Sequence, residues 1–476
     1  MVELKILSHA CALIKTDLHA VVIDPWLVGS CYWRSWWNYP QVELDESELA
    51  AVDAVVISHI HWDHWHGPSL KRFFKGKRII IPDEPGLRSE TDLRAIGFQD
   101  IVRVPHAGSV DVGDIRLTLY QFGLYLNDAA VVAEAQGVKI LDANDAKIAG
   151  AALGQLTRCH GRFDFAMRSH SSANARVCFR VRGETLGDVD DREHYFRSYV
   201  AFMDKVQPRH AVPFASNHCH LHDDVYSLNS YVSNPVELGR YVAAQHAAHQ
   251  PGWSFAPMLP GSSWSSVDGF QLRSTDCYED LDTRIAAYRA QVVDRLDAYT
   301  RQENAVTISD ALVQRFTAML PGPARRKAVL ADFVLTVRWP DSRARSWTVD
   351  LRSRQATACE TALLDSEPGR PLMVLPAIVF RDAVVKNMFH HAVISKRCVF
   401  RADSAVDMQV IHHVMTELDR RELGVRPWSL RYARRMAAAY VGRWRELLVY
   451  AHAVWLMKVR RKPVFLAEEA ILRDEF

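Results

Sequence analysis

The sequence lacks the features that mark several classes of protein. Its eight cysteines form no CxxC pair and no regular framework of spacings. We therefore expect reduced thiols in a cytosol-like compartment and no disulfide scaffold. The formal net charge of only +2 gives no reason to expect a nucleic-acid partner. No internal repeat or low-complexity tract is visible, which argues against repeat and disordered architectures.

Long uncharged hydrophobic runs are also missing. The most apolar late stretch, Met436–Val459, is interrupted by Arg443, Arg445 and Glu446. A charge at the centre of a bilayer costs about 2.5–3.5 kcal/mol, so this stretch is expected to be a buried or surface helix. The N-terminal residues Met1–Lys15 have no signal-peptide pattern and are expected to enter the fold directly as a strand. We therefore expect a cytoplasmic protein without a membrane span.

What is present up to about residue 250 is a series of short β-type runs with helices between some of them. A helix is expected at Arg192–Val206. Many strands with interleaved helices predict an α/β layered domain over residues 1–250. The expected strands are Val2–Leu7, Cys11–Thr16, Ala20–Ile23, Ala54–Ile57, Arg78–Ile81, Ile101–Val104, Ile115–Tyr120, Ala129–Ala133, Lys139–Leu141, Phe163–Met167, Val177–Val181 and Ala211–Phe214.

Residues 267–476 are expected to form a separate α+β accessory domain. The segment Gln250–Ser266, rich in Pro, Gly and Ser, is interpreted as the linker. A hairpin is expected around Pro340–Asp341, and no motif in this domain points to chemistry. Helical periodicity covers Thr283–Tyr299, Pro376–His390, Ser404–Leu418 and Ser429–Val459, and the hairpin strands are Phe333–Val337 and Trp347–Leu351.

The last of these helices is dense in arginine. A charge-rich amphipathic helix is usually a solvated face, and that interpretation is preferred over an acidic partner or a membrane surface. The arginines are Arg431, Arg434, Arg435, Arg443, Arg445, Arg460 and Arg461.

The strongest chemical signal is the run Val55–Gly67. An apolar strand delivers His59, His61, Asp63 and His64 within six residues before Gly67. In the loop after a strand, His59 and His61 can face one metal while Asp63 and His64 face a second. Neutral imidazole and carboxylate suit zinc and iron alike, so this ligand set predicts a metal site without choosing the metal.

HxHxDH directly after a β-strand resembles the signature of the metallo-β-lactamase superfamily. The surrounding residues are similar to one branch, the CMP-N-acetylneuraminic acid hydroxylases and their bacterial relatives. This resemblance covers roughly residues 1–250 and, more loosely, the C-terminal domain. The stretches that carry it are Ser8–Cys11, Asp24–Trp26, Trp33–Trp37, Ala129–Asp145 and Val212–Ala215.

The resemblance implies a four-layer αββα metallo-β-lactamase fold with a C-terminal α+β domain. The hydroxylases of that branch carry an N-terminal Rieske iron–sulfur domain, whereas this sequence begins with the metal-binding fold. An oxygenase of this kind would need an external electron donor.

The same resemblance implies three further ligands: a middle histidine, a bridging aspartate and a late histidine. Asp145 matches the aspartate. The expected middle stretch Leu117–Leu126 contains no histidine, and His106 lies upstream in a turn, where it is expected at the surface. For the late ligand His218 is preferred over His220, and both over His222. His170 is a further candidate, and we assign His170 and His220 to the substrate where they do not bind metal.

Without a middle histidine, one metal is left with His59, His61 and Asp145. Two histidines and one carboxylate with open positions form the facial triad of non-haem iron oxygenases, whereas zinc hydrolases of the superfamily use a metal-bound water. The pattern is compatible with both chemistries and favours iron, as one ion or two, over zinc.

Further residues are expected around the metals. With Asp63, we assign catalytic roles to His9 and Asp24, and Asp24 is expected to accept a ring N–H from a ligating histidine. An aromatic cluster with an embedded arginine is interpreted either as a contact for a nucleotide-linked substrate or as packing, in a lid over the metals or in a contact with the second domain. Its members include Trp33, Arg34, Trp36 and Trp37.

Three functions follow from these residues. The first is a non-haem iron oxygenase that hydroxylates a small polar substrate. The second is a zinc hydrolase of a phosphodiester, lactone or thioester. The third is a scaffold that kept the fold without catalysis, and the intact HxHxDH run ranks it last.

Overall fold

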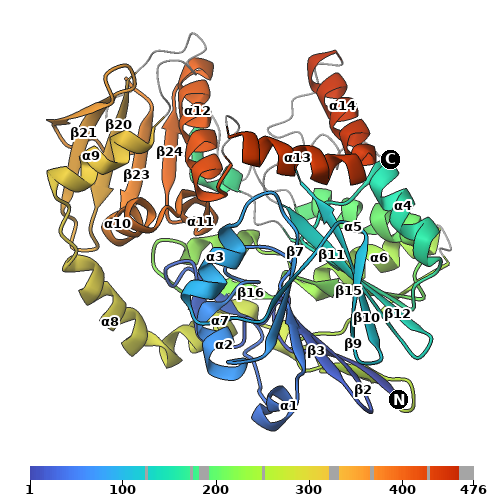
Figure 1. Cartoon of the computed structure of the whole chain (residues 1–476). Coiled ribbons are helices and arrows are strands. Elements are labelled where there is room, and N and C mark those ends of the chain that lie inside the picture. The colour runs from blue at the N-terminus through green and yellow to red at the C-terminus, as the bar shows by residue number, and fades with distance from the viewer. Residues whose placement is uncertain are drawn as a thin grey trace.

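The computed structural model describes residues 1–123, 127–171, 175–181, 192–248, 252–320, 332–364, 369–425 and 429–459. Figure 1 shows a larger layered part, which contains the N-terminus, and a smaller sheet with its own helices to one side.

Two sheets form the centre of the larger part. Among the described residues, the first sheet has the strand order β19 (Gly269–Gln271), β18 (Ser263–Ser265), β1 (Val2–Ile6), β2 (Ala12–Thr16), β3 (Ala20–Ile23), β6 (Ala54–Val56), β7 (Arg78–Pro82) and β8 (Ile101–Val104). The second has the order β17 (Ser254–Phe255), β15 (His210–Phe214), β13 (Phe165–Ser169), β12 (Val138–Asn144), β11 (Asp128–Ala135), β10 (Ile115–Phe122) and β9 (Gly108–Val112).

The apolar core lies between these two sheets and on both outer faces. Residues such as Leu4 and Leu119 are fully buried between the sheets. Helices α1 (Glu46–Ala50), α2 (Gly67–Phe73) and α3 (Arg88–Ala95) cover the first sheet, and α4 (Gly150–His160), α5 (Arg192–Val206) and α6 (Pro235–Ala248) cover the second. Because each sheet is apolar on both faces, each needs a helical layer outside it. The result is the expected four-layer αββα fold.

The segment expected to be a linker is part of these sheets. β17 pairs with β15, and β18 pairs with β1, with Leu4 opposite Trp264. β19 then continues the first sheet to Gln271. The secondary structure of the layered domain therefore extends past residue 250. Short strands at a sheet edge need few apolar residues, which is why periodicity did not predict them.

The smaller part is a mixed sheet with helices on it, as an α+β fold requires. Its strand order among the described residues is β14 (Phe179–Val181), β24 (Val399–Ala402), β23 (Leu372–Pro376), β20 (Phe333–Arg338), β21 (Ala344–Asp350) and β22 (Gln355–Cys359). β14 comes from the N-terminal half, so the chain crosses between the two parts more than once. The helices that share a core with this sheet include α9 (Asp310–Met319), α10 (Ala377–Lys386), α11 (Phe389–Ile394) and α12 (Ala405–Glu422). Helix α7 (Leu281–Gln291) instead packs on the layered part through Ile285, and α8 (Val293–Asn304) leads from α7 to the smaller part.

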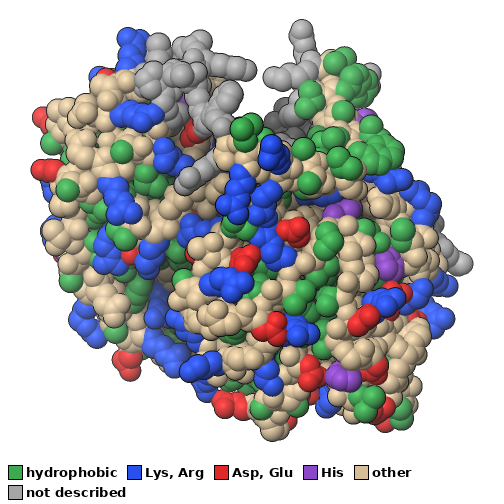
Figure 2. Space-filling view, viewed as in Figure 1, with side chains coloured by type: hydrophobic (Ala, Val, Ile, Leu, Met, Phe, Trp, Pro, Cys, Tyr) green, Lys and Arg blue, Asp and Glu red, His purple; other side chains and the backbone are tan. Residues whose placement is uncertain are grey.

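The arginine-rich C-terminal stretch forms two helices that return to the layered domain. α13 (Leu430–Gly442) and α14 (Trp444–Lys458) meet at Arg443, which is buried. The Arg443 guanidinium binds the Glu446 carboxylate and donates to the Gly123 carbonyl oxygen at 2.8 Å. Arg443 is therefore a packing residue and not part of a solvated face, whereas Arg460 and Arg461 lie outside the described residues. Figure 2 shows apolar side chains gathered over α14. In the part of the chain that is described, no helix is both long and apolar enough to cross a bilayer.

Candidate metal centre

The HxHxDH loop leaves the first sheet at the carboxyl end of β6. β6 runs parallel to β3, so both strands end at the same edge, and Asp24 follows β3 directly. Asp24 adopts a left-handed backbone conformation (φ 51°), which Asp tolerates better than most residues. Its carboxylate accepts hydrogen bonds from the Ser58 N–H (2.7 Å) and from the Ser58 Oγ hydroxyl (2.6 Å). These contacts fix the start of the loop against the neighbouring strand end.

The structure brings the first two histidines of the motif together through specific ring atoms. His59 Nε2 and His61 Nδ1 lie 2.8 Å apart. Burial lowers the pKa of both rings well below the usual value, and each neighbouring imidazole lowers it further. Both side chains are therefore held neutral, which is the form that binds a cation.

Asp145 arrives at the same edge from the second sheet. It follows β12, whose last residue Asn144 has a left-handed conformation (φ 36°). Asp145 Oδ2 lies 3.3 Å from His64 Nε2. His59, His64 and Asp145 each present one ligand atom within 4.8 Å of the others. The two sheets thus contribute opposite sides of one candidate site.

A second group lies directly beside the first and shares His64. His9 Nε2 is 3.2 Å from Asp63 Oδ2, and His64 Nε2 is 3.5 Å from the same oxygen. The Tyr32 hydroxyl donates a hydrogen bond to the other Asp63 oxygen. His9, Asp63 and His64 also meet the 4.8 Å condition. The two groups overlap at His64, whose Nε2 can bind one cation at a time, so a second cation would depend on the other donors of its group.

The electrostatics of this region fit a bound cation. Burial alone would lower the pKa of His64, but the adjacent Asp63 and Asp24 carboxylates raise it well above its usual value. Asp24 Oδ2 lies 2.7 Å from His64 Nδ1, so Asp24 holds the ring with Nε2 toward Asp63 and Asp145. Burial and the charge of Asp24 also raise the pKa of Asp142 well above its ordinary value. Several carboxylates buried this close together are stabilised by positive charge, which a divalent ion supplies.

Among the late histidines, His218 lies nearest to the second group. Its ring stacks on Trp36 at 4.0 Å and lies 5.3 Å from the ring of His9. Both ring nitrogens of His218 are buried without a hydrogen-bond partner in the described structure. Buried polar atoms are rarely left without a partner, so this side chain suits a metal ligand.

The other three candidates have contacts of their own. His220 Nδ1 lies 3.1 Å from the Ser35 carbonyl oxygen, and His170 Nδ1 lies 3.3 Å from Ser233 Oγ. His222 Nδ1 lies 3.8 Å from an oxygen of Asp224.

Sequence reasoning missed Asp128, which lies just beyond the stretch searched for a middle histidine. It begins β11, and its Oδ1 is 4.0 Å from His59 Nε2. The search for this ligand covered Leu117–Leu126, of which residues 124–126 lie outside the described residues. The sequence did offer a clue to Asp128, because a carboxylate at the start of a strand can bind a metal at that edge of the sheet.

Sequence reasoning also missed two histidines from the accessory domain. His390 and His391 lie in α11, and His390 Nε2 is 2.8 Å from His61 Nε2. His391 Nε2 lies 3.2 Å from the Ile60 carbonyl oxygen. These residues are 329 and 331 positions away from their partners along the chain. No local pattern reveals such a contact.

The predicted aromatic substrate contacts are mostly packed. Trp36 and Trp37 are only 2% and 1% exposed, so neither offers a free face to a substrate. Trp33 donates through Nε1 to Asp382 of the accessory domain at 3.1 Å. Of the two readings, the packed contact between domains fits Trp36 and Trp37. Trp33 and Arg34 do line a cavity of about 480 Å³, together with Trp62 of the metal loop.

Comparisons with known proteins give a family match over part of the chain. Residues 3–151 match the family model described as beta-lactamase superfamily domain. A putative Rieske 2Fe-2S iron-sulfur protein of Mycolicibacterium smegmatis is 24% identical over 244 residues, which cover 48% of this chain and 46% of that protein. The cytidine monophosphate-N-acetylneuraminic acid hydroxylase of Mus musculus is 30% identical over 155 residues, which cover 30% of this chain and 26% of the hydroxylase. The chain thus spans less than half the length of these two relatives.

Solved structures with a similar arrangement include a metallo hydrolase, Igni18 of Ignicoccus hospitalis, and CmlA, a diiron beta-hydroxylase of Streptomyces venezuelae. The first is 15% identical with a TM-score of 0.39, and its alignment covers 55% of this chain and 97% of the hydrolase chain. The second is 16% identical with a TM-score of 0.36, and its alignment covers 54% of this chain and 53% of the CmlA chain. On the family match and on the layered fold built around HxHxDH, the chain contains a domain of the metallo-β-lactamase superfamily.

Proposed function

We propose that this protein is a non-haem iron oxygenase that hydroxylates a small polar molecule. The observation that carries the proposal is the donor set on one side of the centre. His59 and His61 present their nitrogens 2.8 Å apart, and the neighbouring positions are occupied by the carboxylates of Asp128 and Asp145. A site with two histidines and carboxylates is typical of iron enzymes that activate dioxygen.

The two halves of the centre have different donors. His59, His61, Asp128 and Asp145 would hold one iron. Asp63 and His64 would hold the second, with His218 and the shared Asp145 completing it. Bound there, iron would supply dioxygen activation.

The protein residues around the centre would fix the ligands and move protons. Asp24 orients His64, and Tyr32 orients Asp63 through the hydrogen bonds described above. His9 lies 3.2 Å from Asp63 Oδ2 and is fully buried, so it can hold a proton at Nε2 beside that oxygen. His390 contacts His61 on the side of the ring away from His59.

The names of the relatives support this type of reaction. The matching stretch of the vertebrate hydroxylases is 30–32% identical to this chain. Neither candidate ligand group in the described residues includes a cysteine, so the centre itself offers no ligands for an iron–sulfur cluster. We propose that a separate protein, or the substrate itself, donates the electrons.

A zinc hydrolase is the second candidate. The observation that favours it is the pair of adjacent groups that share His64. Two cations held side by side can activate a water and stabilise the leaving oxygen of a phosphodiester or lactone. A third possibility, a scaffold without catalysis, is supported by no feature of the ligand geometry.

Metal content and oxygen consumption separate these functions. The full chain, purified after expression with iron available, is expected to contain iron and to consume oxygen only when a reductant or substrate is added. The His61→Ala variant is expected to lose both properties while its far-UV dichroism stays the same. Stoichiometric zinc with hydrolysis of a model phosphodiester or lactone would replace the proposal with the hydrolase.

A further inference from the structure

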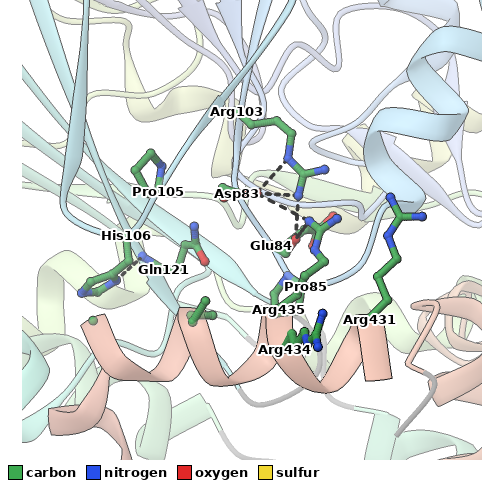
Figure 3. Close-up of a pocket in the computed structure, with 13 residues that line it drawn as sticks. Asp83, Glu84, Pro85, Arg103, Pro105, His106, Gln121, Arg431, Arg434 and Arg435 are labelled. Carbon is green, nitrogen blue, oxygen red and sulfur yellow. Dashed lines mark hydrogen bonds and ion pairs between the residues drawn. The ribbon is translucent and has the colours of Figure 1, made fainter. Parts of the chain in front are cut away.

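A cavity of about 800 Å³ lies between α13 and the ends of β7, β8 and β10 (Figure 3). Its walls come from both parts of the chain. α13 supplies three arginines, and the strand ends supply Arg103, Asp83 and Glu84. The cavity opens at the edge of the sandwich where β6 delivers the metal loop, since β6, β7 and β8 are parallel neighbours.

The metal loop and this cavity share α13. Ile60, which lies between His59 and His61, packs against Tyr432 and Met436 of that helix. Of the three arginines of this helix, Arg435 reaches the loop that holds Asp83 and Glu84, as Figure 3 shows. The cavity is thus a neighbour of the candidate metal centre and not part of its ligand set.

The lining carries an excess of positive charge. In the lining, four arginines (Arg103, Arg431, Arg434 and Arg435) face two carboxylates (Asp83 and Glu84). Figure 2 shows basic side chains gathered around α13 in the middle of this face. An open cavity lined in this way concentrates anions.

The four arginines are not equivalent. Arg103 is already paired, with Asp83 at 2.6 Å and with Glu90 at 3.0 Å. Arg435 donates to the Glu84 carbonyl oxygen at 2.8 Å. Within the described residues, Arg431 and Arg434 make no hydrogen bond and no ion pair, so their guanidinium groups have donors left for a ligand.

The surroundings of Arg435 include both signs of charge, since burial and the other arginines lower the pKa of its guanidinium while the carboxylates of Asp83 and Glu84 raise it. Its partial burial, followed by the charge of Arg103, lowers the pKa of its guanidinium, and the charge of Arg431 lowers it further. Like charges held together in this way are stabilised by an anion between them.

Neutral donors and an apolar wall complete the cavity. His106 Nδ1 accepts a hydrogen bond from the Gln121 backbone N–H at 3.1 Å, so in the neutral ring the proton is on Nε2. Burial and the charge of Arg443 lower the pKa of His106 to about 4, which keeps the ring neutral near pH 7. His106 lies in the turn expected from the sequence and is half-buried in the wall of this cavity. Pro85, Pro105, Ala438 and Ala439 supply an uncharged surface.

We propose that this cavity binds a small molecule that carries a dianionic group, either a phosphate ester or a pair of carboxylates. Arg431 and Arg434 bind the anionic group, because a guanidinium matches phosphate and carboxylate oxygens through paired N–H donors. The uncharged remainder of the molecule lies along the proline and alanine wall. The proposal is independent of the metal chemistry proposed above.

Titration calorimetry on the full chain at low ionic strength tests this site. The probes are phenyl phosphate, phthalate and benzyl alcohol, which share an aromatic ring and differ in charge. At least one of the two dianions is expected to bind, and benzyl alcohol is not. Tighter binding of phenyl phosphate identifies a phosphate ester as the natural ligand class, and tighter binding of phthalate identifies a dicarboxylate. Added salt is expected to weaken binding, since the contacts are charged and partly exposed.

Two variants separate this cavity from the metal centre. Arg431→Gln/Arg434→Gln is expected to weaken dianion binding by about tenfold or more. Both side chains are exposed, so thermal stability should not change. Arg301→Gln, an exposed arginine near the end of α8, serves as the matched control and should bind like the wild type. His59→Ala/His61→Ala should retain dianion binding even if the proposed oxygenase function fails. The proposal is overturned if neither dianion binds, if the double arginine variant binds like the wild type, or if only the histidine variant loses binding.

Discussion

His61 and His390 face each other through their Nε2 atoms at 2.8 Å, across the boundary between the two domains. His61 Nδ1 is the atom that faces His59 Nε2. Burial alone would lower the pKa of His390, but Asp419 and the charges of Glu422 and Asp128 raise it to about 9, so without metal the His390 Nε2–H faces His61. If His61 binds metal through Nδ1 and carries its own proton on Nε2, His390 must lose this proton before it can accept from His61. The other ring nitrogen of His390 lies 3.6 Å from Asp419 of α12. The accessory domain thus holds the tautomer and orientation of a proposed ligand, which gives this domain a role at the centre.

His390→Ala should weaken metal binding by about 10- to 100-fold, the usual effect of losing the partner that orients a metal-binding histidine. His390→Gln should restore part of the affinity, because its amide can accept from His61 and donate to Asp419. Metal titration followed by a competing chelator measures both.

The matched control is His19→Ala. His19 Nδ1 also lies 3.0 Å from a carboxylate, that of Asp114, but at the opposite end of β2 and β3. It should bind metal like the wild type. Equal metal affinity in His390→Ala and His19→Ala would show that His390 is only a packing residue.

Asp128→Ala should lower metal content, because it removes the carboxylate 4.0 Å from His59 Nε2. The expected result is loss of one of two bound ions, measured by elemental analysis after gel filtration. Asp111→Ala removes an exposed carboxylate that pairs with Arg116 at the surface, and should leave metal content unchanged. If Asp128→Ala still binds both ions, the ligands of the ion beside His59 are limited to His59, His61 and Asp145.

Metal removal should destabilise the fold. Without a cation, the buried carboxylates of Asp63 and Asp145 lose their compensating charge. For an ion present at about 1,000 times its Kd, the loss is about 4 kcal/mol. Thermal unfolding with and without a chelator should show the difference in wild type. A chelator should not change the thermal unfolding of His59→Ala/His61→Ala. If it lowers the unfolding temperature of that variant as much as that of the wild type, the stabilising ion binds elsewhere.

The parts of this architecture that the sequence predicts are those with a local signal. Predicted strands such as Ala20–Ile23 and Ile101–Val104 begin and end at the same residues in the structure. They were predictable because a run of apolar or alternating residues indicates a strand with at least one buried face. The helix Arg192–Val206 also agrees, since its apolar spacing repeats over several turns. The HxHxDH loop is visible for the same reason, as all its members lie within six residues.

The parts that the sequence does not predict depend on distant partners. Asp128 and His390 have no motif of their own, and their relevance comes only from the chain folding back to His59 and His61. The long C-terminal helix was expected to continue through Arg443, but it breaks there, because that side chain is buried against Glu446 and Gly123. Contact between domains overrides local helix preference at such a position.

Arg397 connects three segments of the chain and should control stability at low pH. Its guanidinium is 1% exposed, binds Glu303 through contacts of 3.0 and 2.8 Å, and donates to Asp224 at 2.8 Å and to the Trp33 carbonyl oxygen at 3.1 Å. Burial alone would raise the pKa of Asp224, but Arg397 and Arg338 hold it well below its ordinary value. Because the folded-state pKa is lowered, this carboxylate stabilises the fold above its unfolded pKa of about 3.9, and that contribution is lost as the pH falls below it.

Arg397→Met should therefore lower the free energy of unfolding by about 3–5 kcal/mol at pH 7, because it leaves Glu303 without its buried cation and Asp224 with Arg338 alone. The difference between variant and wild type should shrink as the pH falls below about 4, where Asp224 becomes protonated in the variant. Urea unfolding between pH 7 and pH 3 measures both effects. The triple variant Arg397→Met/Asp224→Asn/Glu303→Gln should recover part of the loss, since it removes the uncompensated charges. Arg116→Met, which breaks an exposed pair with Asp111, should stay close to wild type. If Arg397→Met costs no more than Arg116→Met, the buried cluster does not hold the two domains together.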